Sequence, residues 1–245
     1  MTQLVSQEYG KNVNRKRVRR IMKENDLLSS VRRRKWSDEV YAKRRALKAN
    51  IPEDLIKQNF FALEPRKRML EDITYLPGLE KTMYLNTIED LFNGEILAYC
   101  ISDSPNAKLC ADTIEILCAN WGECFRGSII HNDLGSSYVS YEYRNALKAH
   151  GIIQSIGRVA TCYDNAPMES LNGIIKTEAL YCRFGKTRVK EKRVPISEIL
   201  EAVTDFISYY NNKRPKASNG GLSPVQFRLQ SPRGTYLIPI DTKGI

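Results

Sequence analysis

The sequence predicts an α/β fold, a mixed five-stranded sheet with flanking helices, preceded by a small helix-turn-helix segment. Short apolar runs of strand length alternate with longer segments whose apolar residues recur at helical spacing. The pair Asn93-Gly94, which lies between two of the apolar runs, is a strong hairpin signal. The start of the chain is far more basic than the remainder. These three observations together indicate two parts with different tasks.

The expected elements follow one another in a definite order. The five strand candidates are Met69–Tyr75, Met83–Phe92, Glu95–Ser102, Ser128–His131 and Ile152–Ile156. The four helix candidates in this part are Asn106–Ala119, Tyr141–His150, Pro167–Cys182 and Ile196–Tyr210. Gly151 suits the position just past a helix end. Three strands, a helix, a strand, a helix, a strand and further helices is the order of an RNase H-like domain, although several α/β folds share parts of it.

Composition favours a polyanionic partner and argues against a membrane protein. The net charge is +10 and the pI is about 9.3, which fits a nucleic-acid partner or, more plainly, a basic soluble protein. No apolar run reaches the roughly 18 residues of a membrane span, and the first residues lack the pattern of a secretory signal. We therefore expect no membrane contact and a cytoplasmic, nucleoid-associated bacterial protein.

Cysteine and histidine give no metal site. The six cysteines include no Cys-x-x-Cys pair, and the only histidines are His131 and His150. No familiar zinc spacing results. We expect the cysteines to be reduced and mostly buried and assign them no chemistry.

The N-terminal residues predict a DNA-reading helix. Eleven Lys or Arg and two acids lie between Lys11 and Lys35. Apolar residues at helical spacing make 14–24 an amphipathic helix, and Gly10 separates it from an earlier one at about 2–8, as in a helix-turn-helix. The expected DNA contacts are Arg15, Lys16, Arg19 and Arg20. The alternative is a basic helix that packs on the main domain without touching DNA.

The predicted domain division follows from these patterns. It consists of a helix-turn-helix-like DNA-binding segment at 1–35, a basic linker at 36–65, an RNase H-like core with C-terminal helices at 66–228, and a tail at 229–245.

Three acids stand out by position. Asp72 lies inside the first strand candidate, where an unpaired carboxylate is costly. Asp133 follows the fourth strand candidate, and strand ends are where ligands gather in α/β sheets. Glu169 lies on the helix that begins near Pro167. Any one of the 28 acids could simply be surface charge, so the spacing alone leaves this question open.

Three carboxylates suit one kind of chemistry particularly well. Two Mg²⁺ ions about 4 Å apart need hard anionic oxygen ligands, and such a pair stabilises both the attacking and the leaving oxygen of a phosphodiester. Asn165, Asn172, Gly173 and Lys176 share the helix face of Glu169. They make a poor core stripe but a suitable phosphate-facing surface, on which Lys176 would hold a phosphate.

Local sequence resembles a known family over nearly the whole chain. The matching segments are Asp72–Leu76, His131–Tyr138, Cys162–Ser170 with Gly173 and Lys176, Tyr209–Pro215 with Leu222–Phe227, and Val13–Met22. They resemble the three catalytic motifs, the C-terminal signature and the upstream helix-turn-helix of insertion-sequence transposases with a retroviral-integrase-type core. The third motif and the C-terminal signature are the most specific. The chain is similar to the second-frame product of two-frame insertion elements.

The resemblance implies an RNase H fold and a DDE-type polynucleotidyl transferase. It implies Mg²⁺ or Mn²⁺, two ions, at Asp72, Asp133 and Glu169. The reaction would be hydrolysis at the element's end followed by attack of the freed 3′-hydroxyl on another strand. Expected partners are double-stranded DNA (terminal repeats and target), further copies of the chain on that DNA, and a first-frame partner protein.

The sequence departs from the family pattern at several positions. Met69 replaces the usual Trp, Glu71 the usual Thr and Asn132 the usual Ser, and alternation points Glu71 to the sheet face opposite Asp72. Against the family pattern, we expect the chain to begin inside the first helix of the upstream domain, through either a shortened frame or a misplaced start. The alternative function is therefore a catalytically inactive DNA-binding remnant or a repressor of transposition. A plain RNase H-type nuclease is a third possibility, which the basic N-terminal segment disfavours.

Overall fold

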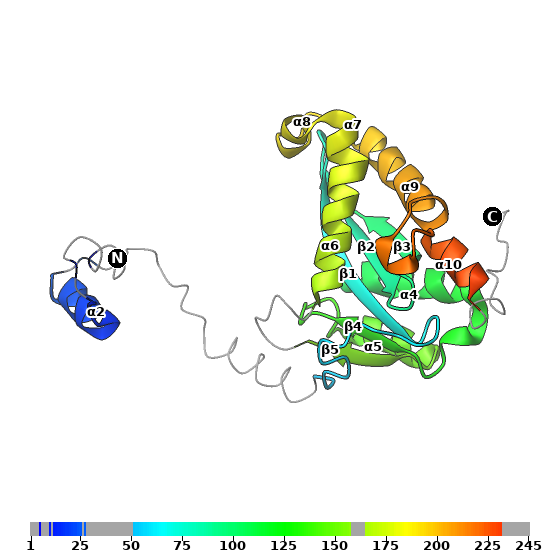
Figure 1. Ribbon diagram of the computed structural model, residues 1–245, viewed down its shortest axis with the longest axis horizontal. Helices are drawn as coiled ribbons and strands as arrows, with labels where there is room; N and C mark the ends of the chain where they lie inside the picture. Colours follow the sequence, from blue (N-terminus) through cyan, green and yellow to red (C-terminus); the bar gives the residue numbers. More distant parts are fainter. Residues whose placement is uncertain are drawn as a thin grey trace. The chain divides into compact units, whose positions relative to one another are not determined.

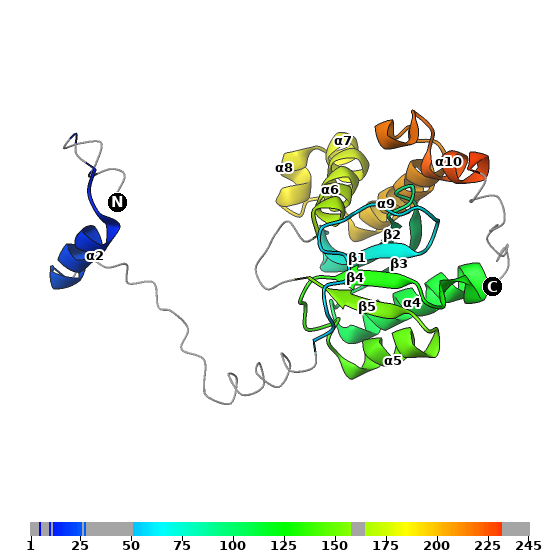
Figure 2. The ribbon, with the colours of Figure 1, turned by 60° about the horizontal axis from the view of Figure 1, so that its bottom comes forward.

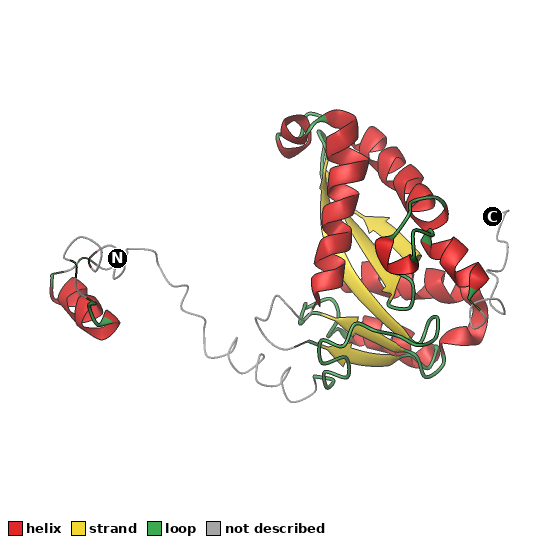
Figure 3. Ribbon diagram, in the orientation of Figure 1, coloured by secondary structure: helices red, strands yellow, loops and turns green. Residues whose placement is uncertain are grey.

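The computed structural model describes residues 5, 10, 12–25, 27, 51–157 and 165–231. The chain divides into two compact units, Met1–Ala46 and Leu47–Ile245, and each is described by itself. Figure 1 shows the elements along the chain, and Figure 3 shows that strands occur only in the larger of the two described parts.

The smaller unit contains the predicted basic helix. Helix α2 covers Arg15–Glu24, and the Asn14 side chain caps its start by accepting a 2.8 Å hydrogen bond from the Lys16 N–H. Val18 is buried, whereas Arg15, Lys16, Arg19 and Arg20 are exposed. The helix is therefore amphipathic with a basic outer surface, as predicted. The expected helix at about 2–8 lies largely outside the described residues.

The larger unit contains one five-stranded sheet. Its strands are β1 (Arg68–Pro77), β2 (Thr82–Asp90), β3 (Ile96–Ser102), β4 (Ile129–Asn132) and β5 (Ile153–Ile156). The spatial order is β3-β2-β1-β4-β5, with antiparallel pairing among the first three strands and parallel pairing of β4 with β1 and β5. All five predicted strands and the mixed sheet are confirmed, and the arrangement is RNase H-like.

The remaining elements are helices, whose bounds complete the unit. They are α4 (Ala107–Trp121), η1 (Gly122–Phe125), α5 (Tyr141–Ala149), α6 (Ala166–Ile174), η3 (Ile175–Tyr181), α7 (Cys182–Phe184), α8 (Lys186–Lys190), α9 (Ile196–Asn212), η4 (Ala217–Asn219) and α10 (Pro224–Gln230).

Two apolar cores lie on the two faces of the sheet. One core joins the sheet to α4 and α5 through residues such as Ile88, Ile114 and Leu147. The other joins it to α6, η3 and α9 through residues such as Leu70 and Val203. Figure 2 shows α4 and α5 on one side of the sheet and α6 and α9 on the other. A two-faced sheet of this kind leaves its strand ends available for a site.

The predicted helix Pro167–Cys182 is interrupted. It begins as α6, continues as the π-helix η3 and ends as α7, so that Figure 1 shows one rod running beside β1. A π-helix carries more residues per turn than an α-helix and is often found at functional sites. Lys176 lies within this π-helix. The seven-residue spacing from Glu169 therefore does not place the Lys176 side chain as it would in a continuous α-helix.

The predicted Asn93-Gly94 turn between β2 and β3 is confirmed, and Gly94 has a φ of +75°. Residues of the C-terminal signature contact this hairpin. Asn211 Oδ1 on α9 accepts a 2.9 Å hydrogen bond from the Ile96 N–H, and Asn211 Nδ2 donates a 2.8 Å hydrogen bond to the Ile96 carbonyl. Arg228, the residue directly after the signature on α10, forms a buried ion pair with Glu95, at 2.7 Å. The signature therefore stabilises the edge of the sheet.

Residues before β1 also contact the sheet. Ile56 and Ala62 are buried, and the Leu55 N–H donates to Ser155 Oγ on β5 at 2.8 Å. The part of the predicted linker that the structure describes thus packs on the larger unit. The four-part domain division itself stays a prediction.

Two smaller observations complete the description. Of the helices that the structure describes, none is long and apolar enough to cross a membrane. The described cysteines are free; Cys110 and Cys118 are buried and Cys182 is exposed.

Candidate active site

The sheet register brings the first two predicted acids together. Leu70 on β1 is the partner of His131 on the parallel strand β4. Asp72 and Asp133 each follow two residues later, so Asp72, in the middle of β1, lies level with Asp133, directly after the end of β4. Glu169 is in the first turn of α6, which packs on β1. Three separate elements therefore bring the three acids within electrostatic reach of one another.

The electrostatics of Asp72 show that the acids share one environment. Asp72 is half-buried, and its pKa is raised to about 7, first by burial and then by repulsion from Asp133 and Glu169. No cation among the described residues forms an ion pair with Asp72. The site therefore holds more negative charge than its own side chains neutralise.

Asn172 connects the Glu169 helix to Asp72. Its Nδ2 donates a 2.7 Å hydrogen bond to Asp72 Oδ2. Its Oδ1 is buried and has no hydrogen-bond partner among the described residues, and the same holds for Asn165 Oδ1. Both amide side chains are buried. The contact that the structure gives Asn172 is therefore the hydrogen bond to Asp72.

Lys176 lies at the edge of this site. Its Nζ is 3.9 Å from the centre of the Tyr75 ring, a cation–π contact. Burial lowers its pKa, while the nearby Asp72 opposes that shift. The ammonium is thus held beside β1, near Asp72.

The donors fit a hard divalent cation. They are carboxylates with uncompensated repulsion and buried amide oxygens that lack a partner, and Mg²⁺ and Mn²⁺ prefer such oxygens. In the described part of the chain, no three His, Cys, Asp or Glu side chains are close enough together to hold one ion. Asp133 and Glu169 are exposed, and their side chains can therefore reorient.

Glu71 lies on the other face of β1, as the alternation of the strand predicted. It is fully buried and accepts hydrogen bonds from Asn86 Nδ2 at 2.6 Å, from Asn132 Nδ2 at 2.9 Å and from the Tyr143 hydroxyl. Burial raises the pKa of Glu71 to about 7, and these three donors oppose the shift. The network joins β1, β2, β4 and α5 directly behind the site.

The predicted site residues fall into two groups. Asp72, Asp133, Glu169, Asn165, Asn172 and Lys176 all belong to the larger unit. Arg15, Lys16, Arg19 and Arg20 belong to α2 in the smaller unit. Sequence patterns had not singled out Tyr75, Tyr84, Lys190 or Lys192, which lie in a groove that continues from Lys176. The dense basic run at 183–193 was the available signal.

Comparison with known families gives matches over most of the chain. Residues 62–162 and 169–231 match integrase core domain models, and residues 1–35 match an HTH-like domain model. An uncharacterized transposase-like protein of Haemophilus influenzae is 34% identical over 222 residues, covering 89% of this chain and 94% of the relative. The putative transposase InsK for insertion sequence element IS150 of Escherichia coli is 29% identical, covering 91% of this chain and 74% of the relative.

Solved structures agree in fold. A chain of the simian T-cell lymphotropic virus intasome, in a complex with PP2A regulatory subunit B56 gamma, gives a TM-score of 0.58 at 19% identity, covering 80% of this chain and 64% of that one. The catalytic core domain of BIV integrase gives 0.51 at 17% identity, covering 70% and 99%. At such identities these likenesses show a shared integrase-type core fold.

Proposed function

Because this chain belongs to the insertion-sequence transposases with an integrase core, we propose that it cleaves DNA at the ends of an insertion element and joins them to a target. The family's activity is DNA transposition and recombination, a polynucleotidyl transfer. The observation that supports the proposal for this chain is geometric: the β1–β4 register sets Asp72 level with Asp133, and Asn172, on the helix that carries Glu169, donates a 2.7 Å hydrogen bond to Asp72. In this proposal the three acids form a DDE-type site.

In this proposal Asp72, Asp133 and Glu169 hold two Mg²⁺ or Mn²⁺ ions. When bound, the ions supply Lewis acidity at the attacking and leaving oxygens of the phosphodiester. Asn172 fixes the orientation of the Asp72 carboxylate through its 2.7 Å hydrogen bond. Lys176 supplies positive charge for a phosphate beside the acids. Asn165 lies at the start of α6, the helix that carries Glu169. The chain's own groups thus mainly position the DNA backbone.

The basic helix α2 would read DNA. Arg15, Lys16, Arg19 and Arg20 are exposed, and such side chains neutralise phosphates and release counterions. The substrates are the double-stranded terminal repeats and the target DNA. We further propose assembly of several copies on that DNA together with a first-frame partner protein.

The test is strand transfer by the full chain on DNA that carries the element's terminal repeats. We expect joined product with Mg²⁺ and none with EDTA. Asp133→Asn should abolish cleavage but leave DNA binding unchanged, because the substitution removes a ligand and no DNA contact. Equal loss of cleavage and binding would refute the role of Asp133. Binding without product, also after addition of the first-frame protein, would instead indicate a repressor or an inactive remnant.

The role of α2 has its own test. Replacing Arg15, Arg19 and Arg20 with Ala should weaken duplex binding and reduce the slope of log K against log salt by up to about 2.7, or 0.9 for each lost phosphate contact. Binding and slope that stay unchanged would remove α2 from the DNA-reading role.

A further inference from the structure

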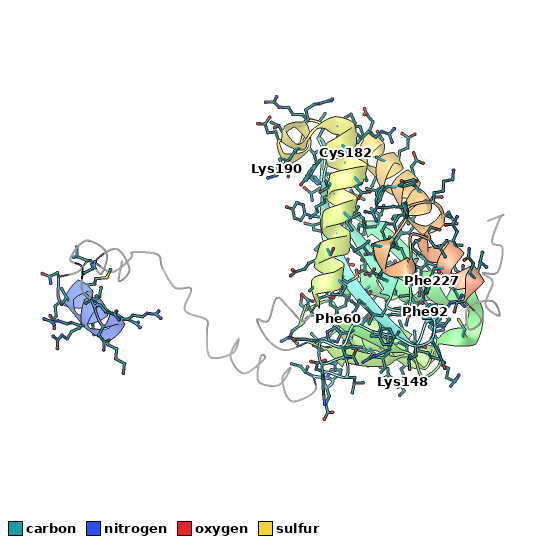
Figure 4. The ribbon with its side chains drawn as sticks, in the orientation of Figure 1. Phe60, Phe92, Lys148, Cys182, Lys190 and Phe227 are labelled. Carbon is teal, nitrogen blue, oxygen red and sulfur yellow. The ribbon has the colours of Figure 1, made fainter. Side chains whose placement is uncertain are left out.

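A groove begins at Lys176 and leads away from the catalytic acids. It has a volume of about 570 Å³ and lies between the outer end of the β1–β2 pair, the π-helix η3 and the residues around α8. Its lining includes three tyrosines and three lysines: Tyr75, Tyr84, Tyr181, Lys176, Lys190 and Lys192. Figure 4 shows Lys190 at the α8 end of the larger unit, far from Lys148 at the opposite end.

The groove is strongly basic. Three of its ten lining residues are lysines and none is acidic. The adjoining segment 183–193 contains six Lys or Arg and a single acid, Glu191, which pairs with Arg193 at 2.9 Å. Lys190 is exposed and has no ion-pair partner among the described residues. This charge remains available for a polyanion.

Aromatic rings lie among these charges. Tyr75 and Tyr84 are direct partners across β1 and β2, and Tyr75 is 56% exposed. Lys176 covers one face of the Tyr75 ring. Flat rings between lysines are the pattern of proteins that bind single-stranded nucleic acid, in which bases stack on the rings and lysines follow the backbone. Acidic peptides would satisfy the lysines alone.

The position of the groove relates it to the reaction. Tyr75 is three residues from Asp72 on the same strand, and the negative charge of Asp72 raises the pKa of Lys176. A strand whose phosphate lies at the acids can therefore continue past Lys176 towards Lys190. The volume is that of a pocket for a small ligand, which suits one or two unpaired nucleotides.

The geometry points to a binding groove for an unpaired DNA strand next to the scissile phosphate, lined by Tyr75, Tyr84, Lys176, Lys190 and Lys192. The inference rests on the proposed function, because it takes the DNA at the acids as given. It implies that the terminal base pairs open when the element's end enters the site. The lysines hold the phosphates of the separated strand, and the tyrosines replace the lost base stacking.

Fluorescence anisotropy of the full chain in EDTA tests the groove without any cleavage. The probes are a labelled single-stranded oligonucleotide of the element's end and the matching blunt duplex. For Lys190→Ala/Lys192→Ala we expect single-strand binding to weaken and its salt slope to fall by about 1.4, or 0.7 per contact. For Tyr84→Leu we expect a loss of roughly fivefold or more, since stacking on one ring contributes about 1–3 kcal/mol.

The control is Lys67→Ala/Lys148→Ala, which removes the same charge from exposed positions outside the groove. An equal loss in this control, or equal weakening of blunt duplex and single strand by the groove variants, would overturn the inference. So would displacement of the DNA by polyglutamate combined with no effect of Tyr84→Leu, which would indicate an acidic protein partner. Groove-dependent binding by a chain that gives no strand transfer would refute the proposed function alone.

Discussion

Two neighbouring carboxylates on β1, Glu71 and Asp72, have opposite surroundings. Glu71 faces α5 and is fully buried among three hydrogen-bond donors. Asp72 faces α6, has one side-chain donor in Asn172, and is repelled by Asp133 and Glu169. Both have their pKa raised to about 7. The pKa alone therefore does not distinguish the structural carboxylate Glu71 from the proposed catalytic carboxylate Asp72, whereas their hydrogen-bond partners and neighbouring charges differ.

The difference shows how one strand serves two purposes. The donors around Glu71 replace the water that it loses on burial, so that its network can stabilise the fold. The groups around Asp72 do not neutralise its negative charge. This repulsion lowers the stability of the fold and favours the binding of a cation. Substitutions on the two sides of β1 should accordingly separate stability from activity.

The largest expected effect is that of Asp72→Asn. It removes a metal ligand, and we expect strand transfer to fall by roughly a thousandfold or more. Because the repulsion from Asp133 and Glu169 also disappears, the free energy of unfolding at pH 8 should rise by about 1 kcal/mol or more. Denaturant titration and the strand-transfer assay measure both. Asp112→Asn, a partly exposed acid on α4 that pairs with Lys108 at 2.9 Å, is the control; it should leave strand transfer unchanged and lose only a surface ion pair. A destabilised Asp72→Asn would contradict the comparison.

Glu71→Ala should do the reverse. It leaves three buried donors without their acceptor, and we expect the free energy of unfolding to fall by about 2–4 kcal/mol. Strand transfer per folded molecule should change far less than in Asp72→Asn. A double-mutant cycle with Asn132→Ala should give a coupling of roughly 0.5–3 kcal/mol. Strict additivity of the two substitutions would mean that the network does not act as a unit.

The smallest expected effect concerns a third, fully compensated acid. Glu178 on η3 pairs with Arg214 at 2.6 and 2.8 Å, which lowers the pKa of Glu178 below its ordinary value of 4.5. The pair therefore stabilises the fold above that pH, and the contribution is lost as pH falls through the lowered pKa. Glu178→Gln should cost roughly 0.5–1.5 kcal/mol at pH 7. The exposed control Glu201→Gln should cost nothing, and a loss that persists in strong acid would contradict the pairing.

Sequence reasoning predicted the sheet well and the packing behind it poorly. Strand order followed from apolar runs and the Asn93-Gly94 turn, since these are local signals. Glu71 and Asn132 each stood out as departures from the family pattern, but only the structure shows that they bond to each other, because a contact between residues 61 positions apart leaves no local trace. The surface that we propose faces DNA was likewise only partly visible in the sequence.

The site was predicted in outline, from motifs rather than from geometry. The π-helix has no simple sequence signature, so an α-helical count placed Lys176 on the face of Glu169, whereas the structure stacks it on Tyr75. The sequence did not reveal that Asn172 donates a hydrogen bond to Asp72, and its contact with phosphates stays a prediction. The groove combines three elements that are distant in sequence, which only the fold brings together.

The most direct test of the central claim is one strand-transfer assay on the unaltered chain, Asp72→Asn and Glu71→Gln, each with Mg²⁺ and with EDTA. We expect metal-dependent joining by the unaltered chain, joining lower by roughly a thousandfold or more for a folded Asp72→Asn at any Mg²⁺ concentration, and joining by Glu71→Gln in proportion to its folded fraction. Joining by Asp72→Asn at a rate close to that of the unaltered chain, or joining by the unaltered chain in EDTA, would contradict the role of Asp72 as a metal ligand.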